Sequence, residues 1–146
     1  MRIYLDMCSI QRPLDTRSHV RIAVEAEAVL GIFALLEAGE LELVASDALM
    51  FEAERNPHPV RKRYALDVIS RATLFVHTDE RIEERARFLV SRKIKPLDAL
   101  HLATAERAKA DCFCTCDDRF LKRARAVGAP PPRIVSPLEL IAEIAS

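Results

Sequence analysis

The sequence predicts an α/β fold in which helices cover a mostly parallel, roughly five-stranded sheet. Short apolar runs alternate along the chain with longer segments of helical periodicity, as in sheets whose strands are joined by helices. Half of the 146 residues are apolar and only three are glycine, which is typical of a globular, helix-rich protein. This length predicts one domain over residues 1–146 with a continuous core.

Five short apolar runs are the expected strands, and each is bounded by turn-forming or capping residues. They cover residues 2–5, 41–45, 74–76, 112–116 and 134–135. Pro13 follows soon after the first of them and is expected to end any regular structure there.

Segments of helical periodicity join these runs. Residues 17–37 carry apolar side chains three and four positions apart, which predicts a long helix ending near Gly39. One helix is expected from Ser46 to Asn56-Pro57 and another over 60–70. The next should run from a cap at Thr78 or Asp79 to about Lys93, and one more should begin at Pro96. The last two are expected over 118–126, before Gly128 and prolines 130–132, and after a capping box formed by Ser136 and Glu139.

The four cysteines and the apolar runs bear on where the protein works. Cys8, Cys112, Cys114 and Cys116 lack the paired spacing of a zinc site, so they are expected to be small apolar residues in a reduced compartment. Charges interrupt every apolar run before it reaches membrane-spanning length, and the N-terminus is acidic too early for a signal peptide. A cytoplasmic location without membrane contact is therefore expected.

The distribution of charge is more informative than its total, because 22 basic and 22 acidic residues cancel. Basic residues gather at 61–63, 92–95 and 119–125, whereas several acids follow strand ends. This separation suits a protein that holds a metal ion among acids and grips a polyanion around it. Arg12, Lys93 and Lys95 are the best candidates for phosphate contacts, because each lies near a strand end or one of the acids.

Three acids stand where a strand meets a helix or where a helix begins: Asp6, Asp98 and Asp117. A single acid at such a position is most often a helix cap. Three carboxylates brought to one edge of a sheet would repel one another unless a cation neutralised them. Mg²⁺ and Mn²⁺ prefer oxygen ligands, so the pattern predicts a site for such an ion at the carboxyl ends of the strands.

Four motifs, YLDMCSI, SDALMFEAE, KPLDALHLATA and FCTCDDRF, extend the pattern over nearly the whole chain. With them the sequence resembles PIN-domain proteins of the VapC type, the ribonuclease toxins of toxin-antitoxin pairs. The resemblance implies a three-layer α/β/α sandwich and four acids around Mg²⁺ or Mn²⁺. Matched by motif, these acids are Asp6, Glu52, Asp98 and Asp117. It also implies hydrolysis of RNA phosphodiester bonds, a separately encoded antitoxin with a basic side chain near the acids, and a homodimer.

The resemblance leaves the second acid open. Glu52 has the usual spacing after Ser46, whereas Glu54 points about 200° around the same helix, so only one can face the other acids. Cys8 replaces a small polar residue that commonly supports the metal site. Ser9 could share that role, and Thr115 could support Asp117.

Two other residues near the acids have two interpretations each. His101 lies one turn beyond Asp98 and is expected to pack rather than to act as a ligand or base. Asp118 could share the fourth acidic position or cap the following helix.

Two alternative functions remain at this stage. A PIN-like module could bind RNA or protein with little or no catalysis, and Cys8 in place of a polar residue favours that alternative. A phosphatase of the haloacid-dehalogenase type would instead use Asp6 as a nucleophile, but it needs an acid where Cys8 stands. Partner contacts are expected on residues 24–36 and 60–69, whose apolar side chains could equally belong to the core.

Overall fold

The protein is described here from a computed structural model that covers residues 1–128 and 130–145. These residues form a five-stranded sheet in the order β3-β2-β1-β4-β5, and every pair of neighbouring strands is parallel. The strands are β1 (Arg2–Leu5), β2 (Glu42–Ser46), β3 (Leu74–Val76), β4 (Cys112–Cys114) and β5 (Arg133–Val135). The prediction of an α/β fold with a parallel sheet is confirmed.

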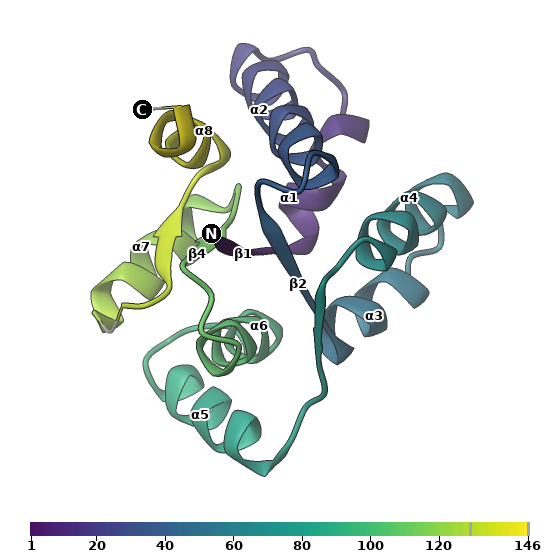
Figure 1. The fold of residues 1–146 in the computed structure, drawn as a ribbon. Coiled ribbons are helices and arrows are strands. Elements are labelled where there is room, and N and C mark those ends of the chain that lie inside the picture. The colour runs from purple at the N-terminus through teal and green to yellow at the C-terminus, as the bar shows by residue number, and fades with distance from the viewer. Residues whose placement is uncertain (129, 146) are drawn as a thin grey trace.

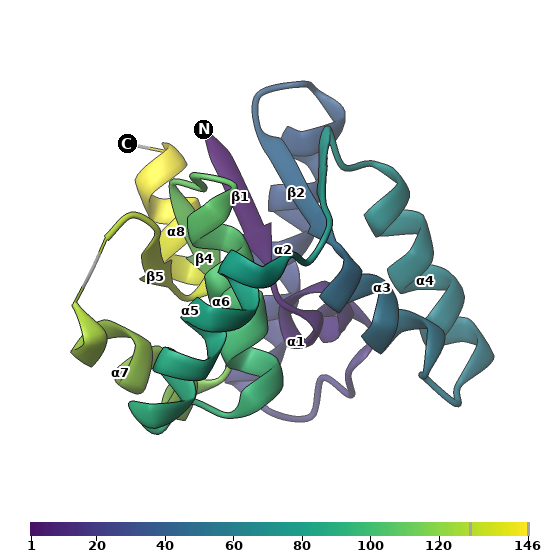
Figure 2. The same cartoon turned by 90° about the horizontal axis from the view of Figure 1, so that it is seen from below.

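Helices cover the sheet on both sides and complete three layers. They are α1 (Met7–Gln11), α2 (Val20–Glu37), α3 (Asp47–Glu54), α4 (Pro59–Ser70), α5 (Glu80–Ser91), α6 (Pro96–Arg107), α7 (Asp118–Val127) and α8 (Pro137–Ala145). Figure 1 shows α1, α2 and α8 on one side of the sheet and α5, α6 and α7 on the other. Seen from below, α3 and α4 continue from the end of β2 (Figure 2). No helix among the described residues is both long and apolar enough to cross a membrane.

Local capping chemistry sets most helix ends where the sequence predicts them. Ser46 accepts a backbone hydrogen bond at the start of α3, and Asp79 does so at the start of α5. Gly128 ends α7 with a φ of 69°, a left-handed conformation that glycine adopts without a steric penalty. Ser136 and Glu139 exchange the two hydrogen bonds of a capping box before α8.

The segment after β1 differs from the prediction. It continues as α1 and then as a short 3₁₀ turn, Arg12–Leu14, so the expectation that Pro13 ends regular structure is wrong. The reason is local. Pro13 stands near the start of the 3₁₀ turn, where its missing N–H and fixed φ are tolerated. The boundaries of other elements shift by a few residues. The long helix begins at Val20 rather than at residue 17, and β4 ends at Cys114 rather than at residue 116.

The core runs along the central strands. Ile3, Tyr4 and Leu5 of β1 are completely buried, as expected for a strand covered on both faces. Cys112 and Cys114 on β4 are also buried, which agrees with their interpretation as small apolar residues. The packing around β1 therefore holds the end of this strand firmly in the middle of the sheet.

Candidate active site

The ends of β1 and β4 lie side by side at the point where the chain changes direction across the sheet. The connection from β1 leads to β2 on one side, whereas the connection from β4 leads to β5 on the other. Leu5 pairs in register with Cys114, and the N–H of Asp6 donates to the Cys114 carbonyl oxygen at 3.2 Å. In open α/β sheets, a crevice outside the strand ends at this position is the usual place for a ligand.

Asp6 follows β1 and is 6% exposed. Its Oδ1 atom accepts hydrogen bonds from the Ser9 N–H and from the Cys8 thiol, each at 3.1 Å, so the carboxylate also caps α1. Burial raises the pKa of Asp6, while hydrogen bonds from Thr115, Cys8 and Ser9 oppose that shift. Cys8 therefore takes the supporting position suggested by the sequence, and Thr115 supports Asp6 as well as the following loop.

Asp98 lies in the first turn of α6 and is partly buried. The pKa of its carboxyl is raised first by burial and then by the negative charge of Asp6, with smaller contributions in the same direction from Asp117 and Glu52. His101 acts in the opposite direction. Three of the acids therefore lie near enough to Asp98 to destabilise its charged form, although they come from separate parts of the sequence.

Asp117 follows β4 and is exposed at the start of α7. Its carboxylate accepts two backbone hydrogen bonds from the first turn of this helix, at 3.0 and 3.2 Å, and its own N–H donates to Thr115 Oγ1 at 3.0 Å. Asp118 is different, because Arg21 binds both of its oxygens at 2.7 and 2.8 Å. This ion pair lowers the pKa of Asp118. Of the two neighbouring acids, Asp117 is thus the helix cap and Asp118 pairs with α2.

The two glutamates of α3 have different surroundings. Glu54 is exposed, whereas the Glu52 side chain is about one quarter exposed and its Oε1 atom contacts Nε2 of His101. Of the two glutamates, Glu52 thus contacts His101 and adds to the negative charge around Asp98, whereas Glu54 is exposed. His101 itself is buried and hydrogen-bonded, so its role includes a polar contact that the expectation of simple packing did not contain.

The donor set fits a hard divalent cation held with water. Carboxylate oxygens are the ligands that Mg²⁺ and Mn²⁺ prefer, and a Mg²⁺ site commonly uses only one or two of them together with several waters. Within residues 1–128 and 130–145, no three His, Cys, Asp or Glu side chains lie close enough to enclose an ion by themselves. Burial raises the pKa values of Asp6 and Asp98, and neighbouring acids raise that of Asp98 further, so a cation would favour the charged forms of both.

Arg12 was a candidate for phosphate contacts, but its guanidinium group is engaged inside the protein. Its Nη1 atom lies 2.9 Å from Asp15, and its Nε atom lies 3.3 Å from Glu25, which is only 2% exposed. Arg21 reaches the other oxygen of Glu25 at 3.4 Å. The structure therefore gives Arg12 a role in neutralising a buried carboxylate.

Replacement of Arg12 by methionine is expected to lower the free energy of unfolding by about 3 kcal/mol, because Glu25 would lose one of its two cationic partners while remaining buried. Urea unfolding measures the change. The double variant Arg12→Met, Glu25→Met should recover most of the loss, since it removes the buried charge as well. A loss of RNA binding without a loss of stability would instead give Arg12 the phosphate role.

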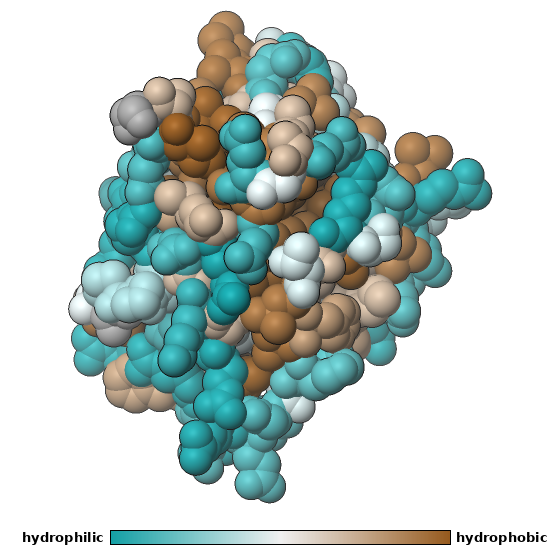
Figure 3. All heavy atoms as spheres, in the orientation of Figure 1, coloured by the Kyte–Doolittle hydropathy of each residue, from teal (hydrophilic) through white to brown (hydrophobic). Residues whose placement is uncertain are grey.

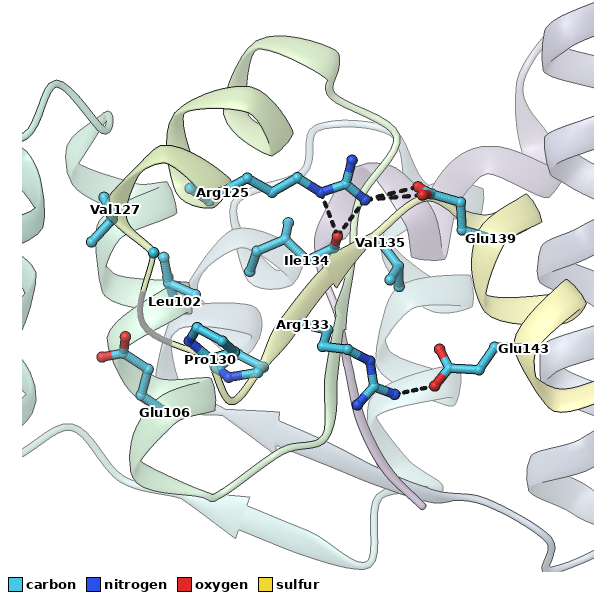
Figure 4. Close-up of a pocket in the computed structure, with 13 residues that line it drawn as sticks. Leu102, Glu106, Arg125, Val127, Pro130, Arg133, Ile134, Val135, Glu139 and Glu143 are labelled. Carbon is cyan, nitrogen blue, oxygen red and sulfur yellow. Dashed lines mark hydrogen bonds and ion pairs between the residues drawn. The ribbon is translucent and has the colours of Figure 1, made fainter.

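A pocket of about 510 Å³ lies elsewhere, between α6, α7, β5 and α8 (Figure 4). Leu102, Val127 and Ile134 give it apolar walls. Arg125 at its edge donates to the Ile134 carbonyl oxygen and pairs with Glu139. None of the four acids lines this pocket. It is therefore separate from the candidate active site.

Tyr4 is a residue near the site that the sequence analysis missed. It is completely buried in β1, and its hydroxyl group lies between Ser46 and His101. A buried tyrosine hydroxyl nearly always has a hydrogen-bond partner, so a tyrosine in a central strand, two residues before an acid, was the available signal. The identity of the partner could not be read from the sequence.

Known proteins share the fold of this chain and part of its sequence. A family model for the PIN domain matches residues 3–126. Ribonuclease VapC46 of Mycobacterium tuberculosis is 38% identical to this chain over 55 residues, which are 36% of this chain and 42% of that protein, so the match covers less than half of the relative.

Two solved structures have a similar fold. The structure of VapBC2 from Rickettsia felis, bound to a DNA fragment from their promoter, matches with a TM-score of 0.61 and 14% identity, over 93% of this chain and 98% of that one. PAE2754 from Pyrobaculum aerophilum matches with a TM-score of 0.55 and 15% identity, over 99% and 90% of the two chains. Since the family model covers most of the sequence and the folds agree, this chain belongs to the PIN-domain family.

Proposed function

We propose that this protein is a metal-dependent endoribonuclease and the toxin of a toxin-antitoxin pair. Two observations support the proposal: Asp6 and Asp117 follow the paired strands β1 and β4, and the charges of Asp6, Asp117 and Glu52 act on Asp98. The PIN-domain match and the relative named as a ribonuclease support the activity. The similar fold of a VapBC2 structure supports the toxin assignment.

Asp6, Glu52, Asp98 and Asp117 would hold Mg²⁺ or Mn²⁺, which supplies Lewis acidity for the attack of water on a phosphodiester. The protein's own side chains prepare this site. The hydrogen bonds from Cys8 and Ser9 fix the direction of the Asp6 carboxylate. The burial of Asp6 reduces competition from bulk water, which strengthens its attraction for a cation.

The connection between α5 and α6 would grip the RNA backbone beside the acids. Among the described residues, Arg92, Lys93 and Lys95 lie within 4 Å of no acidic side chain, so their charge remains available to phosphate. Arg123 donates to the Lys93 carbonyl oxygen at 3.3 Å and ties the connection to α7. Lys95 immediately precedes α6, three residues before Asp98. The surface over α5 is largely hydrophilic (Figure 3).

Replacement of Lys95 by alanine should weaken RNA binding and reduce its salt dependence. Loss of one phosphate contact to single-stranded RNA is expected to lower the slope of log K against log salt by about 0.7. Fluorescence anisotropy in the Asp98→Asn background measures binding without cleavage. Lys109→Ala is the matched control, because Lys109 follows the far end of α6. Equal slopes for the two variants would show that Lys95 does not contact phosphate.

The proposal as a whole is tested by incubating purified protein with a mixed pool of structured RNAs in Mg²⁺, in Mn²⁺ or in EDTA. Cleavage that requires the ion and disappears in the Asp98→Asn variant is the expected result. If the wild type produces no cleavage products in any buffer but still gains thermal stability from Mn²⁺, the protein is a binding module with a metal site. Cleavage that persists in EDTA would refute metal dependence.

The antitoxin and a second copy of the chain are proposed partners. The segments expected to contact them are only partly buried: Val24 and Leu30 on α2 and Val60 on α4 remain exposed. Pro59, Val60 and Tyr64 also line a pocket of about 450 Å³ beside α4. A basic side chain of the antitoxin would neutralise the acids and compete with the metal ion. A complex whose contacts all avoid Asp6 and Asp98 would contradict that mode of inhibition.

A further inference from the structure

A chain of buried hydrogen bonds ends on Glu52. The Tyr4 hydroxyl lies 2.7 Å from Ser46 Oγ and 2.5 Å from His101 Nδ1, and the other ring nitrogen of His101 contacts Glu52. Tyr4 and Ser46 are completely buried, and His101 is 1% exposed. These four side chains come from β1, the end of β2, α6 and α3. This chain of hydrogen bonds therefore connects the centre of the sheet to the helix that carries Glu52.

The donor and acceptor properties of these side chains determine which atom donates in each of the hydrogen bonds. When the Glu52 carboxylate is ionised and the His101 ring is neutral, the carboxylate can only accept, so the ring proton lies on Nε2. Nδ1 of the neutral ring then accepts the single proton of the Tyr4 hydroxyl, and the Ser46 hydroxyl donates to Tyr4. Ser46 at the same time accepts the N–H of Leu49 at 3.1 Å. In this arrangement every donor and acceptor named here has a partner.

The surroundings keep Tyr4 in its place and in its neutral form. Its ring stacks on Phe113 with centroids 5.1 Å apart and meets the edge of His101 at 5.6 Å. Burial raises the pKa of Tyr4 far above its ordinary value, so the hydroxyl keeps the proton that it donates. A rigid donor on the central strand thus fixes which nitrogen of His101 carries its proton.

We propose that Tyr4 and His101 are positioning residues that hold Glu52 in the orientation needed to bind the divalent cation. The inference rests on the proposed function, because it concerns the same four acids. The Glu52 side chain on α3 is about one quarter exposed, and among the described residues the contact with His101 is the only hydrogen bond of its carboxylate. Partners of this kind behind metal-binding side chains are typically worth 10-fold to 100-fold in metal affinity.

Two substitutions of His101 separate the contact with Glu52 from the contact with Tyr4. Glutamine places its amide nitrogen near the position of Nε2, so His101→Gln can still donate to Glu52. Asparagine is shorter and can accept from Tyr4 but cannot reach Glu52. Tyr4→Phe keeps the ring and removes only the hydroxyl group. Circular dichroism of all three variants checks that they fold.

The first readout is the affinity for Mn²⁺ in the absence of RNA, measured by isothermal titration calorimetry. We expect His101→Asn to weaken binding about 10-fold or more and His101→Gln to recover most of that loss. Equal weakening by both substitutions would show that the volume of the His101 ring matters and that its contact with Glu52 does not. Unchanged affinity in His101→Asn would overturn the positioning role outright.

The second readout is the tautomer of His101, obtained from the ring nitrogen signals in NMR spectra of the wild type and assigned by their absence in His101→Asn. The expected result is a ring protonated at Nε2 alone, with the Nδ1 signal shifted in Tyr4→Phe because that nitrogen no longer accepts a hydrogen bond. A proton on Nδ1 in the wild type would overturn the direction of the chain. This spectrum needs neither metal nor RNA, so it distinguishes failure of the positioning role from failure of the nuclease proposal.

Discussion

Replacement of Asp98 by asparagine is expected to lower RNA cleavage at least about 100-fold while leaving the protein no less stable than the wild type in EDTA. A metal ion contributes several kcal/mol to such reactions, and each 1.36 kcal/mol corresponds to a factor of ten in rate. The same carboxylate is unfavourable without an ion, because burial and the neighbouring acids raise its pKa. Removing its charge therefore relieves repulsion in the folded protein.

Cleavage rates and thermal melting of the same preparations measure both effects. Glu54→Gln is the matched control, since it removes an exposed acid from α3 on the side away from His101. It should change neither the rate nor the melting temperature appreciably. A stability loss in Asp98→Asn that accounted for the lost activity would give Asp98 a structural role instead.

Without metal, the contribution of Asp6 and Asp98 to the stability of the protein is expected to fall as the pH rises through the carboxyl range. Asp6 and Asp98 both have pKa values above their ordinary value of 3.8. Between that value and the raised ones, these two carboxyls bind more protons in the folded state than in the unfolded state, so their contribution to the free energy of unfolding decreases with increasing pH. The two contributions are fully present at low pH and are lost as each carboxyl ionises in the folded protein.

A divalent ion should reverse this loss at neutral pH. Free Mn²⁺ at 100 times its dissociation constant would stabilise the folded state by about 2.7 kcal/mol, which corresponds to roughly 6–10 °C in melting temperature. Melting curves at several pH values, in EDTA and in Mn²⁺, give both quantities. The double variant Asp6→Asn, Asp98→Asn should show a weaker pH dependence and little response to Mn²⁺. An equal response of wild type and double variant would mean that the ion binds elsewhere.

Local sequence signals determined the elements and the ends of the strands. Apolar runs and caps such as Ser46 and Asp79 act within a few residues, so they predict where strands end and helices start without knowledge of the fold. Asp6 directly follows β1 and Asp117 lies three residues after β4. Both were expected at one edge, since parallel neighbouring strands bring their carboxyl ends together. The helix α1 was missed because Pro13 was taken as the end of structure.

Contacts between distant segments decided the remaining questions, because they depend on how each helix is rotated against the sheet. The orientation of α3 placed Glu52 against His101 and left Glu54 in solvent. Residues far apart in sequence likewise gave Arg12 and Arg21 their acidic partners. The sequence thus determined the strands, the caps and the placement of Asp6 and Asp117 after neighbouring strands. The tertiary structure decided which glutamate of α3 contacts His101, since a side chain's partner depends on packing across the whole core.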